Sequence, residues 1–252
     1  MIYFVGAGSG APDLITIRGA ERLKQADVII YAGSLVNPAL LSYAKSECAV
    51  YNSAKMTLEE VLDVMTSAEA AGKNTVRLHT GDPCLYGAIR EQMDRLDACD
   101  IAYESVPGVS SFCGAAAALR AEYTLPDVSQ SVVITRMAGR TPVPERESIR
   151  SFAAHGCTMV IFLSSGLTES LQRELLEGGY PGDTPAAIVY KATWPDEKVY
   201  RCTVSTIHQT MTENNIKNTA LITVGGFLGN EYNRSKLYDP AFTTLFREGV
   251  ST

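Results

Sequence analysis

The sequence lacks the features of several large classes of protein. None of its apolar runs approaches the ~20 residues that a membrane-spanning helix needs. The opening MIYFVGAGSG has neither the basic region nor the long apolar stretch of a signal peptide. The six cysteines form no CxxC pair, and the three histidines sit near no cysteine cluster. We therefore expect a cytoplasmic protein with reduced, mostly buried thiols, and neither a structural metal site nor a membrane partner.

Charge of one sign is not concentrated anywhere along the chain. The net charge is −6 and the sequence pI is about 5.2, and no run of like charges interrupts the sequence. This pattern argues against a nucleic-acid partner bound by an extended basic face. An acidic substrate would have to be bound by a few local arginines or lysines.

Residue sets for covalent catalysis and nucleotide binding are also missing. The sequence has no GKS or GKT of a phosphate-binding loop, no credible Ser-His-Asp set and no paired acids of the glycosidase type. Gly6 and Gly8 begin a dinucleotide-binding pattern, but Ala11 stands in the third glycine's place and no acid closes the next strand. The glycine loop is then either a tight strand-to-helix turn or a ligand loop. His79 is most simply a packed or a hydrogen-bonded strand residue.

Apolar, β-branched runs alternate with helical patterns, which indicates an α/β protein. The clearest helix is 57–72, with a capping box at Thr57 and Glu60 and a stop at Gly72, and a second is 85–98. WPDEKVYRCTV follows its preceding strand as a hairpin would. We expect a first α/β domain over 1–120 with a mainly parallel sheet, a linker at 121–130, and a second over 131–252 with a mixed sheet. The predicted strands are 2–5, 28–31, 49–51, 75–78, 101–103, 132–135, 159–163, 187–190, 199–204 and 220–224.

The segments that follow the first-half strands are rich in Gly, Ser, Pro or Asn. They read GAGSGAPD, AGSLVNP, NSAKM, TGDPCLYG and SVPGVSSFCG. In open α/β sheets ligands bind beyond the carboxyl ends of the strands, so this edge is the predicted site. Asp82 is either the N-cap of the 85–98 helix or part of a ligand loop, and the two roles are compatible. Arg136 and Arg140, beside two prolines, are either solvated charges or a grip for carboxylates.

Four of these stretches together resemble the tetrapyrrole methylase family, over nearly the whole chain: FVGAGSGAPDLITIRG, ADVIIYAGSLVNPALL, TGDPCLYGAIREQ and VPGVSSF. The resemblance implies methyl transfer from S-adenosylmethionine to a tetrapyrrole, with S-adenosylhomocysteine as product. It also implies two α/β domains with the donor in the cleft between them, and a homodimer. YAGSLVNP, NSAKMTLEE and TRMAGRTPVPE look most like the branch that methylates C11 of precorrin-4, or its cobalt form, in cobalamin synthesis. The chain departs from the uroporphyrinogen branch, whose YDRLV aspartate it lacks, so no base is carried over.

Two groups of site residues follow from this resemblance. The donor is expected to meet Gly81, Asp82, Leu85, Tyr86, Ser110, Ser111, Phe112, Met137, Leu163, Tyr190, Ala192, Thr219 and Ala220. The tetrapyrrole is expected to meet Gly8, Ser9, Gly10, Ser34, Lys55, Arg136 and Arg140.

Other functions remain open at this stage. Within the fold, the methyl group could go to another ring carbon (C2/C7, C17 or C20), to a protein or to ribosomal RNA, the last disfavoured by the acidic charge. A nicotinamide-dependent oxidoreductase is disfavoured by the missing ribose acid. A non-catalytic ligand-binding protein is the third class, which turnover would distinguish from an enzyme.

Overall fold

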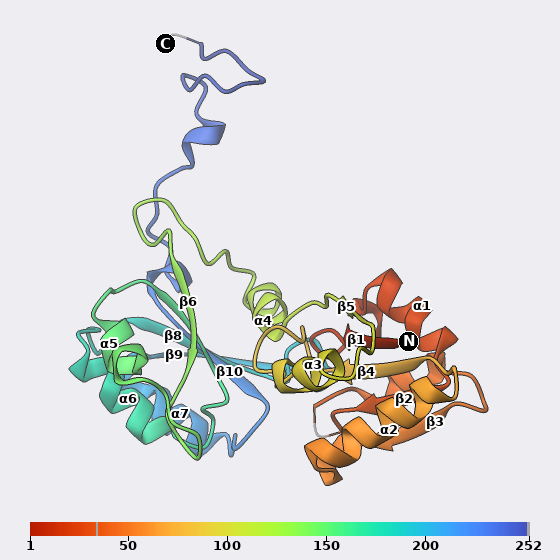
Figure 1. Cartoon of the computed structure of the whole chain (residues 1–252). Coiled ribbons are helices and arrows are strands. Elements are labelled where there is room, and N and C mark those ends of the chain that lie inside the picture. Colours follow the sequence, from red (N-terminus) through yellow and green to blue (C-terminus); the bar gives the residue numbers. More distant parts are fainter. Residues whose placement is uncertain (34, 251–252) are drawn as a thin grey trace. The chain divides into compact units, whose positions relative to one another are not determined.

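The structure, a computed structural model, describes residues 1–33 and 35–250. The chain forms two compact units (Figure 1). The first contains Met1–Ala115 together with Lys191–Glu197, and the second contains Ala116–Tyr190 and the residues from Lys198 onward. The sequence placed the domain boundary at 121–130 and did not predict that a segment of the second half belongs with the first unit.

The first unit is built on a parallel sheet of five strands in the order β3-β2-β4-β1-β5. Val5, Ile29 and Leu78 face one side, with Leu23 of the first helix, whereas Phe4 and Ile30 face the other, with Leu96 of the third. Helices therefore cover both faces, which confirms the predicted parallel α/β domain. Its elements are β1 (Ile2–Gly6), α1 (Ile17–Gln25), β2 (Val28–Tyr31), β3 (Ala49–Asn52), α2 (Leu58–Ala70), β4 (Thr75–His79), α3 (Arg90–Asp97), β5 (Tyr103–Val106) and α4 (Ser111–Leu119), the last of which continues into the second unit.

Local signals located α2 well and α3 less well. The capping box of Thr57 and Glu60 forms as predicted. The predicted 85–98 helix instead begins at Arg90, because Tyr86 and Ala88 have left-handed φ values of 55° and 49° that a right-handed helix cannot contain. The N-cap position of α3 is therefore Ile89, and the expectation that Asp82 caps this helix was wrong.

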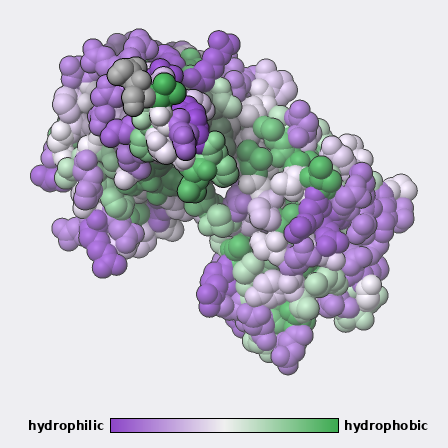
Figure 2. All heavy atoms as spheres, turned by 90° about the horizontal axis from the view of Figure 1, so that it is seen from above, coloured by the Kyte–Doolittle hydropathy of each residue, from purple (hydrophilic) through white to green (hydrophobic). Residues whose placement is uncertain are grey.

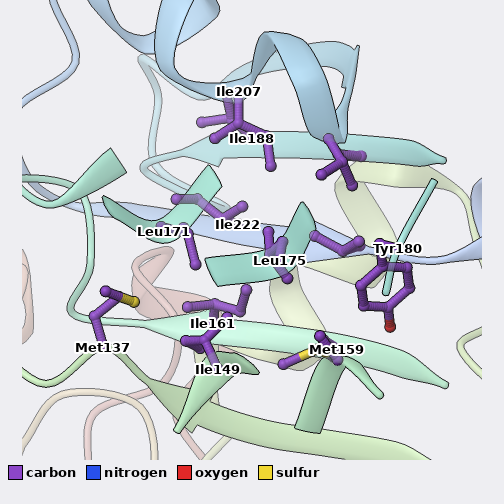
Figure 3. Close-up of a cluster of buried hydrophobic side chains, with 14 of the residues drawn as sticks. Met137, Ile149, Met159, Ile161, Leu171, Leu175, Tyr180, Ile188, Ile207 and Ile222 are labelled. Atoms are coloured by element: carbon purple, nitrogen blue, oxygen red, sulfur yellow. The ribbon is translucent and has the colours of Figure 1, made fainter. Parts of the chain in front are cut away.

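The second unit is built on a mixed sheet in the order β6-β7-β10-β8-β9. Only β6 and β7 pair in parallel, and β8 and β9 form the predicted hairpin. The core lies between this sheet and the helices, where Met159, Ile161, Leu175, Ile188 and Ile222 are fully buried (Figure 3). The elements are β6 (Val132–Arg136), α5 (Ile149–Ala153), β7 (Thr158–Phe162), α6 (Thr168–Glu177), β8 (Pro185–Tyr190), β9 (Lys198–Thr203), α7 (Ile207–Glu213) and β10 (Ala220–Val224).

The surface is mainly hydrophilic on the face shown in Figure 2, with hydrophobic residues scattered between polar ones. Cys84, Cys99 and Cys113 are exposed and the other three cysteines are half-buried, so the expectation of mostly buried thiols was wrong. All six thiols are free in the structure. Among the described residues, no helix is long and apolar enough to cross a bilayer.

Three glycines at the carboxyl ends of β1, β4 and β5 let the backbones of the following loops touch. A Cβ on Gly108 would overlap the Gly81 carbonyl oxygen and lie 2.7 Å from Gly6 Cα. A Cβ on Gly6 would lie 2.6 Å from the same oxygen. Because only glycine fits there, the three loops are held within backbone contact distance at one edge of the sheet.

A row of polar side chains runs under β4, on the face covered by α2 and α3. Thr75, Arg77 and His79 point to this face and are at most 7% exposed. The ring of His79 lies 6.1 Å from that of Phe4, and its Nε2 has no hydrogen-bond partner among the described residues. The imidazole is thus packed, as predicted. Burial, together with the nearby Arg77 charge, lowers the pKa of His79 to about 3.

Substitution of the glycine junction tests its role in stability. Gly108→Ala should lower the free energy of unfolding by ~1–3 kcal/mol, the usual cost of overpacking, because backbone must move to accept the methyl group. Urea denaturation measures the change. Gly166→Ala is the control, since a Cβ there meets nothing within 4 Å. Equal stabilities of the two variants would contradict the proposed packing.

The buried His79 predicts an acid-dependent loss of stability. Its pKa falls from 6.5 to about 3 on folding, so below pH 6.5 the unfolded state takes up a proton that the folded state refuses. Stability should then fall by about 1.4 kcal/mol per pH unit, or about 2–3 kcal/mol by pH 4.5. Urea denaturation of the wild type and His79→Gln at pH 7.5, 5.5 and 4.5 separates this contribution. An equally steep decline in the variant would show that another group is responsible.

Candidate functional site

The loops after β1, β4 and β5 are joined to one another by hydrogen bonds. Gly8 and Gly81 exchange two backbone bonds, of 3.2 and 2.9 Å. The Asp82 carboxylate accepts from the backbone N–H of Cys84 and of Gly108, both at 2.8 Å. Burial alone would raise its pKa, but the hydrogen bonds from Cys84 and Gly108 outweigh burial and keep the pKa of Asp82 below its usual range. Asp82 is therefore an anion that fixes two loops, and it is not suited to be a base.

The 82–89 loop has a strained backbone. Tyr86 and Ala88 are both left-handed, a conformation that costs side-chain-bearing residues ~1–2 kcal/mol each. Between them Gly87 packs against the Pro83 carbonyl with no room for a Cβ. The Tyr86 side chain is 45% exposed and Leu85 is half-buried. Strain of this kind persists only where the surroundings impose it, and it gathers at ligand sites.

The start of α4 lies against the same loops. A Cβ on Gly81 would lie 3.4 Å from Ser110 Cα and 3.5 Å from Ser111 N. Ser110 is buried, whereas Ser111 and Phe112 in the first turn of α4 are half-buried. The first unit therefore brings together the predicted donor residues Gly81, Asp82, Ser110 and Ser111, and it leaves backbone rather than long side chains at this edge.

The predicted donor residues of the second unit lie at one edge of its sheet. Met137 and Leu163 follow β6 and β7, which are parallel neighbours. Ala220 begins β10 and pairs with Tyr190 at the end of β8. Antiparallel β10 therefore starts where β7 and β8 end.

Backbone strain recurs at this second edge. Leu163 and Thr219 have φ values of 51° and 53°, and the Leu163 side chain is 62% exposed although it follows a buried strand. Met137, in contrast, is 4% exposed and belongs to the core, and its N–H donates to Ser164 Oγ. The edge thus presents strained backbone and an exposed apolar side chain.

The glycine loop after β1 is covered by the 191–197 segment. Thr193 Oγ1 accepts from Ala11 N at 3.0 Å and lies 3.1 Å from Ser9 Oγ. The ring of Trp194 occupies the space that a Cβ of Gly10 would take. Gly8, Ser9 and Gly10 are all buried, as is Ala192 of the covering segment. The Ser9 hydroxyl, predicted to face the tetrapyrrole, thus lies against another part of the protein.

The predicted carboxylate-binding cations differ in their surroundings. Arg136 Nη1 donates to the carbonyl oxygens of Met137 and Thr141, at 3.1 and 3.2 Å, and Nη2 donates to that of Pro142 at 2.9 Å. Arg136 therefore closes its own loop. Arg140 and Lys55 are exposed, and Ser34, the remaining predicted contact, lies outside the described residues.

Sequence reasoning missed Thr193, Trp194 and Asn37. Asn37 donates through Nδ2 to the Gly10 carbonyl at 2.8 Å and caps the following turn through Oδ1. No local pattern signals the Thr193 contact, because its partner is 184 positions away in the sequence. Asn37 before Pro38 does carry a signal, since Asn-Pro is a common turn start.

The residues described above can position a ligand, and the two titratable groups near the first edge, Asp82 and His79, are not free to react. Asp82 is engaged as an acceptor, and His79 stays neutral and buried near neutral pH. No group of three or more His, Cys, Asp or Glu capable of holding a metal occurs among residues 1–33 and 35–250. The first edge therefore presents the exposed Tyr86 beside strained backbone, and the second edge presents the exposed Leu163 in the same way.

Known proteins resemble the chain over nearly its full length. It is 52% identical to cobalt-precorrin-4 C(11)-methyltransferase of Methanocaldococcus jannaschii over 98% of this chain and 96% of the relative. A solved cobalt precorrin-4 methyltransferase, described as a cobalamin biosynthetic enzyme, is similar with a TM-score of 0.89 and 48% identity, over 91% of this chain and 96% of that one.

A second solved structure holds a ligand. Uroporphyrin-III C-methyltransferase from Thermus thermophilus, complexed with S-adenosylhomocysteine, has a TM-score of 0.76 and 26% identity, over 90% of this chain and 98% of that one. The family model described as "Tetrapyrrole (Corrin/Porphyrin) Methylases" matches residues 1–208. The joined loops, the strained strand ends and these likenesses agree, and the chain belongs to the tetrapyrrole methylase family.

Proposed function

We propose that this protein transfers a methyl group from S-adenosylmethionine to C11 of a cobalt-precorrin-4-type ring in cobalamin biosynthesis. The observation that carries the proposal is the 52% identity, over 98% of the chain, to an enzyme named for that reaction. The solved structure with the TM-score of 0.89 is also named for the cobalt-containing substrate, which supports the cobalt form.

The geometry supports donor binding by loop backbone. Gly81, Asp82, Tyr86 and Ser110 at the first edge, with Leu163, Thr219 and Ala220 at the second, are the residues we assign to the donor. When bound, S-adenosylmethionine supplies an electrophilic methyl group on a sulfonium. The protein's part is to orient the two substrates and exclude water, which in favourable cases provides ~7–11 kcal/mol of barrier reduction. The neutral His79 and the engaged Asp82 agree with a site that does little proton transfer.

We assign recognition of the ring carboxylates to Arg140, and we assign to Arg136 the shape of the loop that carries it. Arg136 donates three hydrogen bonds, to the carbonyls of Met137, Thr141 and Pro142. Arg140 forms no hydrogen bond or salt bridge with the described part of the chain. The family resemblance further implies a homodimer, and we keep the cytoplasmic location that the scattered cysteines suggested. Light scattering tests this assembly, with twice 27.2 kDa expected.

Product analysis tests the reaction and the ring position. Incubation with carbon-labelled S-adenosylmethionine and cobalt-precorrin-4 should give a product whose NMR spectrum shows the label at C11. Calorimetry should show binding of S-adenosylhomocysteine and none of NAD. A label at C17 or C20 would move the protein to another branch of the family, and tight NAD binding without a response to S-adenosylhomocysteine would replace the proposed reaction class.

Substitution of the loop arginines tests carboxylate recognition. Arg140→Ala should weaken ring binding about tenfold or more, since a hydrogen bond to a charged group contributes ~1.5–3 kcal/mol, and it should leave donor affinity and melting temperature unchanged. Arg146→Ala is the matched control, because the Arg146 side chain is 87% exposed and pairs with the neighbouring Glu147. Calorimetric titration with the ring measures both. Equal ring affinities in the two variants would remove Arg140 from the site.

Arg136 should respond differently. Arg136→Lys should weaken ring binding although it keeps the charge, because an ammonium on a flexible stem does not reproduce the planar guanidinium that spans three carbonyls. Normal ring binding by Arg136→Lys, with loss in Arg136→Ala, would show instead that the charge of Arg136 meets the substrate directly.

A further inference from the structure

Gln92 links the strained 82–89 loop to the core of the first unit. It lies in the first turn of α3 and is 4% exposed. Its Nε2 donates to the Ala88 carbonyl at 2.9 Å, and its Oε1 accepts from Arg77 Nε at 3.3 Å. The side chain therefore connects the left-handed end of the loop to a residue on the central strand of the sheet.

The loop needs a constraint at each end to keep its shape. Tyr86 and Ala88 have unfavourable φ values, and residues in such conformations relax unless their surroundings hold them. Asp82 supplies the constraint at the front, through its bonds from Cys84 and Gly108. The bond from Gln92 to the Ala88 carbonyl is the corresponding constraint at the rear.

Arg77 determines which way the Gln92 amide points. Arg77 is 7% exposed, and no carboxylate lies within ion-pair distance of it in the described residues. Its partners are Gln92 Oε1 and the Ile30 carbonyl, the latter at 3.2 Å. Burial lowers the pKa of Arg77 to about 10, so it remains a cation at neutral pH. A guanidinium only donates hydrogen bonds, so the amide oxygen must face it and the amide NH₂ must face Ala88.

We propose that Gln92 is a positioning residue for methyl-donor binding, oriented by the buried Arg77 and acting through the Ala88 carbonyl on the loop that carries Asp82 and Tyr86. The proposal rests on the proposed function, because it assigns the 82–89 loop to S-adenosylmethionine. Gln92 itself is buried behind the loop and acts on the ligand only through the shape of the backbone.

Gln92→Glu separates this role from a merely structural one. Glutamate keeps an acceptor for Arg77 and supplies the counter-charge that the guanidinium lacks, but as a carboxylate it cannot donate to the Ala88 carbonyl. The variant should fold, with a melting temperature no lower than that of Gln92→Met, which loses both bonds. It should nevertheless bind S-adenosylhomocysteine about tenfold more weakly than the wild type. The KM for S-adenosylmethionine should rise in parallel, while ring affinity stays unchanged.

Two further measurements keep the test specific. Gln172→Glu is the matched control, because Gln172 also accepts through Oε1, from His208 N, in the second unit, and its donor affinity should equal that of the wild type. Amide hydrogen exchange over residues 84–89 should accelerate in Gln92→Glu and not in Gln172→Glu. If Gln92→Glu does not fold, the same comparison is made without the buried charge, between Arg77→Met and the double variant Arg77→Met with Gln92→Met. The double variant should bind S-adenosylhomocysteine more weakly than Arg77→Met alone.

The outcomes distinguish this inference from the proposed function. A wild-type protein that does not bind S-adenosylhomocysteine would overturn the proposed function itself. The other outcome is that the wild type binds S-adenosylhomocysteine and the folded Gln92→Glu has the same affinity and the same exchange rates as the wild type. Gln92 would then serve only as the acceptor for Arg77, and the positioning role would be wrong.

Discussion

Direct contact between backbones at Gly6, Gly81 and Gly108 is the constraint on which the first-unit loops depend. A side chain at Gly6 or Gly108 would separate the ends of β1, β4 and β5, which are adjacent in the sheet. With the strand ends in contact, Asp82 reaches Gly108, and Gly8 pairs with Gly81. The loops are then fixed by short-range bonds that need no bound ligand, which is the preorganisation that a positioning site requires.

The second unit reaches a similar result by other means. Leu163 follows β7, whose Met159 and Ile161 are fully buried in the core of Figure 3, so the end of this strand has little freedom. Leu163, directly after β7, and Thr219, directly before β10, have left-handed φ values. The free energy of packing β7 and β10 offsets this local strain. The exposed side chain of Leu163 is therefore held in place, whereas a flexible loop would let it fold back onto the protein.

Sequence patterns predicted the structural features that depend on residues close together in the sequence. Apolar runs located most of the strands, although the run at 101–103 overlaps β5 (Tyr103–Val106) by one residue only, and Thr57 and Glu60 predicted their capping box. The small-residue loops follow the strands of the first sheet as predicted, and their assignment to a ligand stays a prediction. Contacts between distant positions were missed. Asp82 reaches Gly108 instead of capping a helix, and Thr193 covers Ser9. Neither contact leaves a periodic signal, because the fold alone brings the partners together.

The chemistry of methyl transfer explains why the shape of the loop backbone matters more at this site than reactive side chains. Transfer of a methyl group from a sulfonium to an electron-rich ring carbon needs little help from a base, so selection acts on alignment. Alignment to a fraction of an ångström is better supplied by buried polar groups with one allowed orientation than by long exposed side chains. Arg77 meets this requirement: it is buried without a counter-ion, and the amide it orients can donate in only one direction. An uncompensated charge in the core, costly for stability, thereby becomes useful for the geometry of the loop.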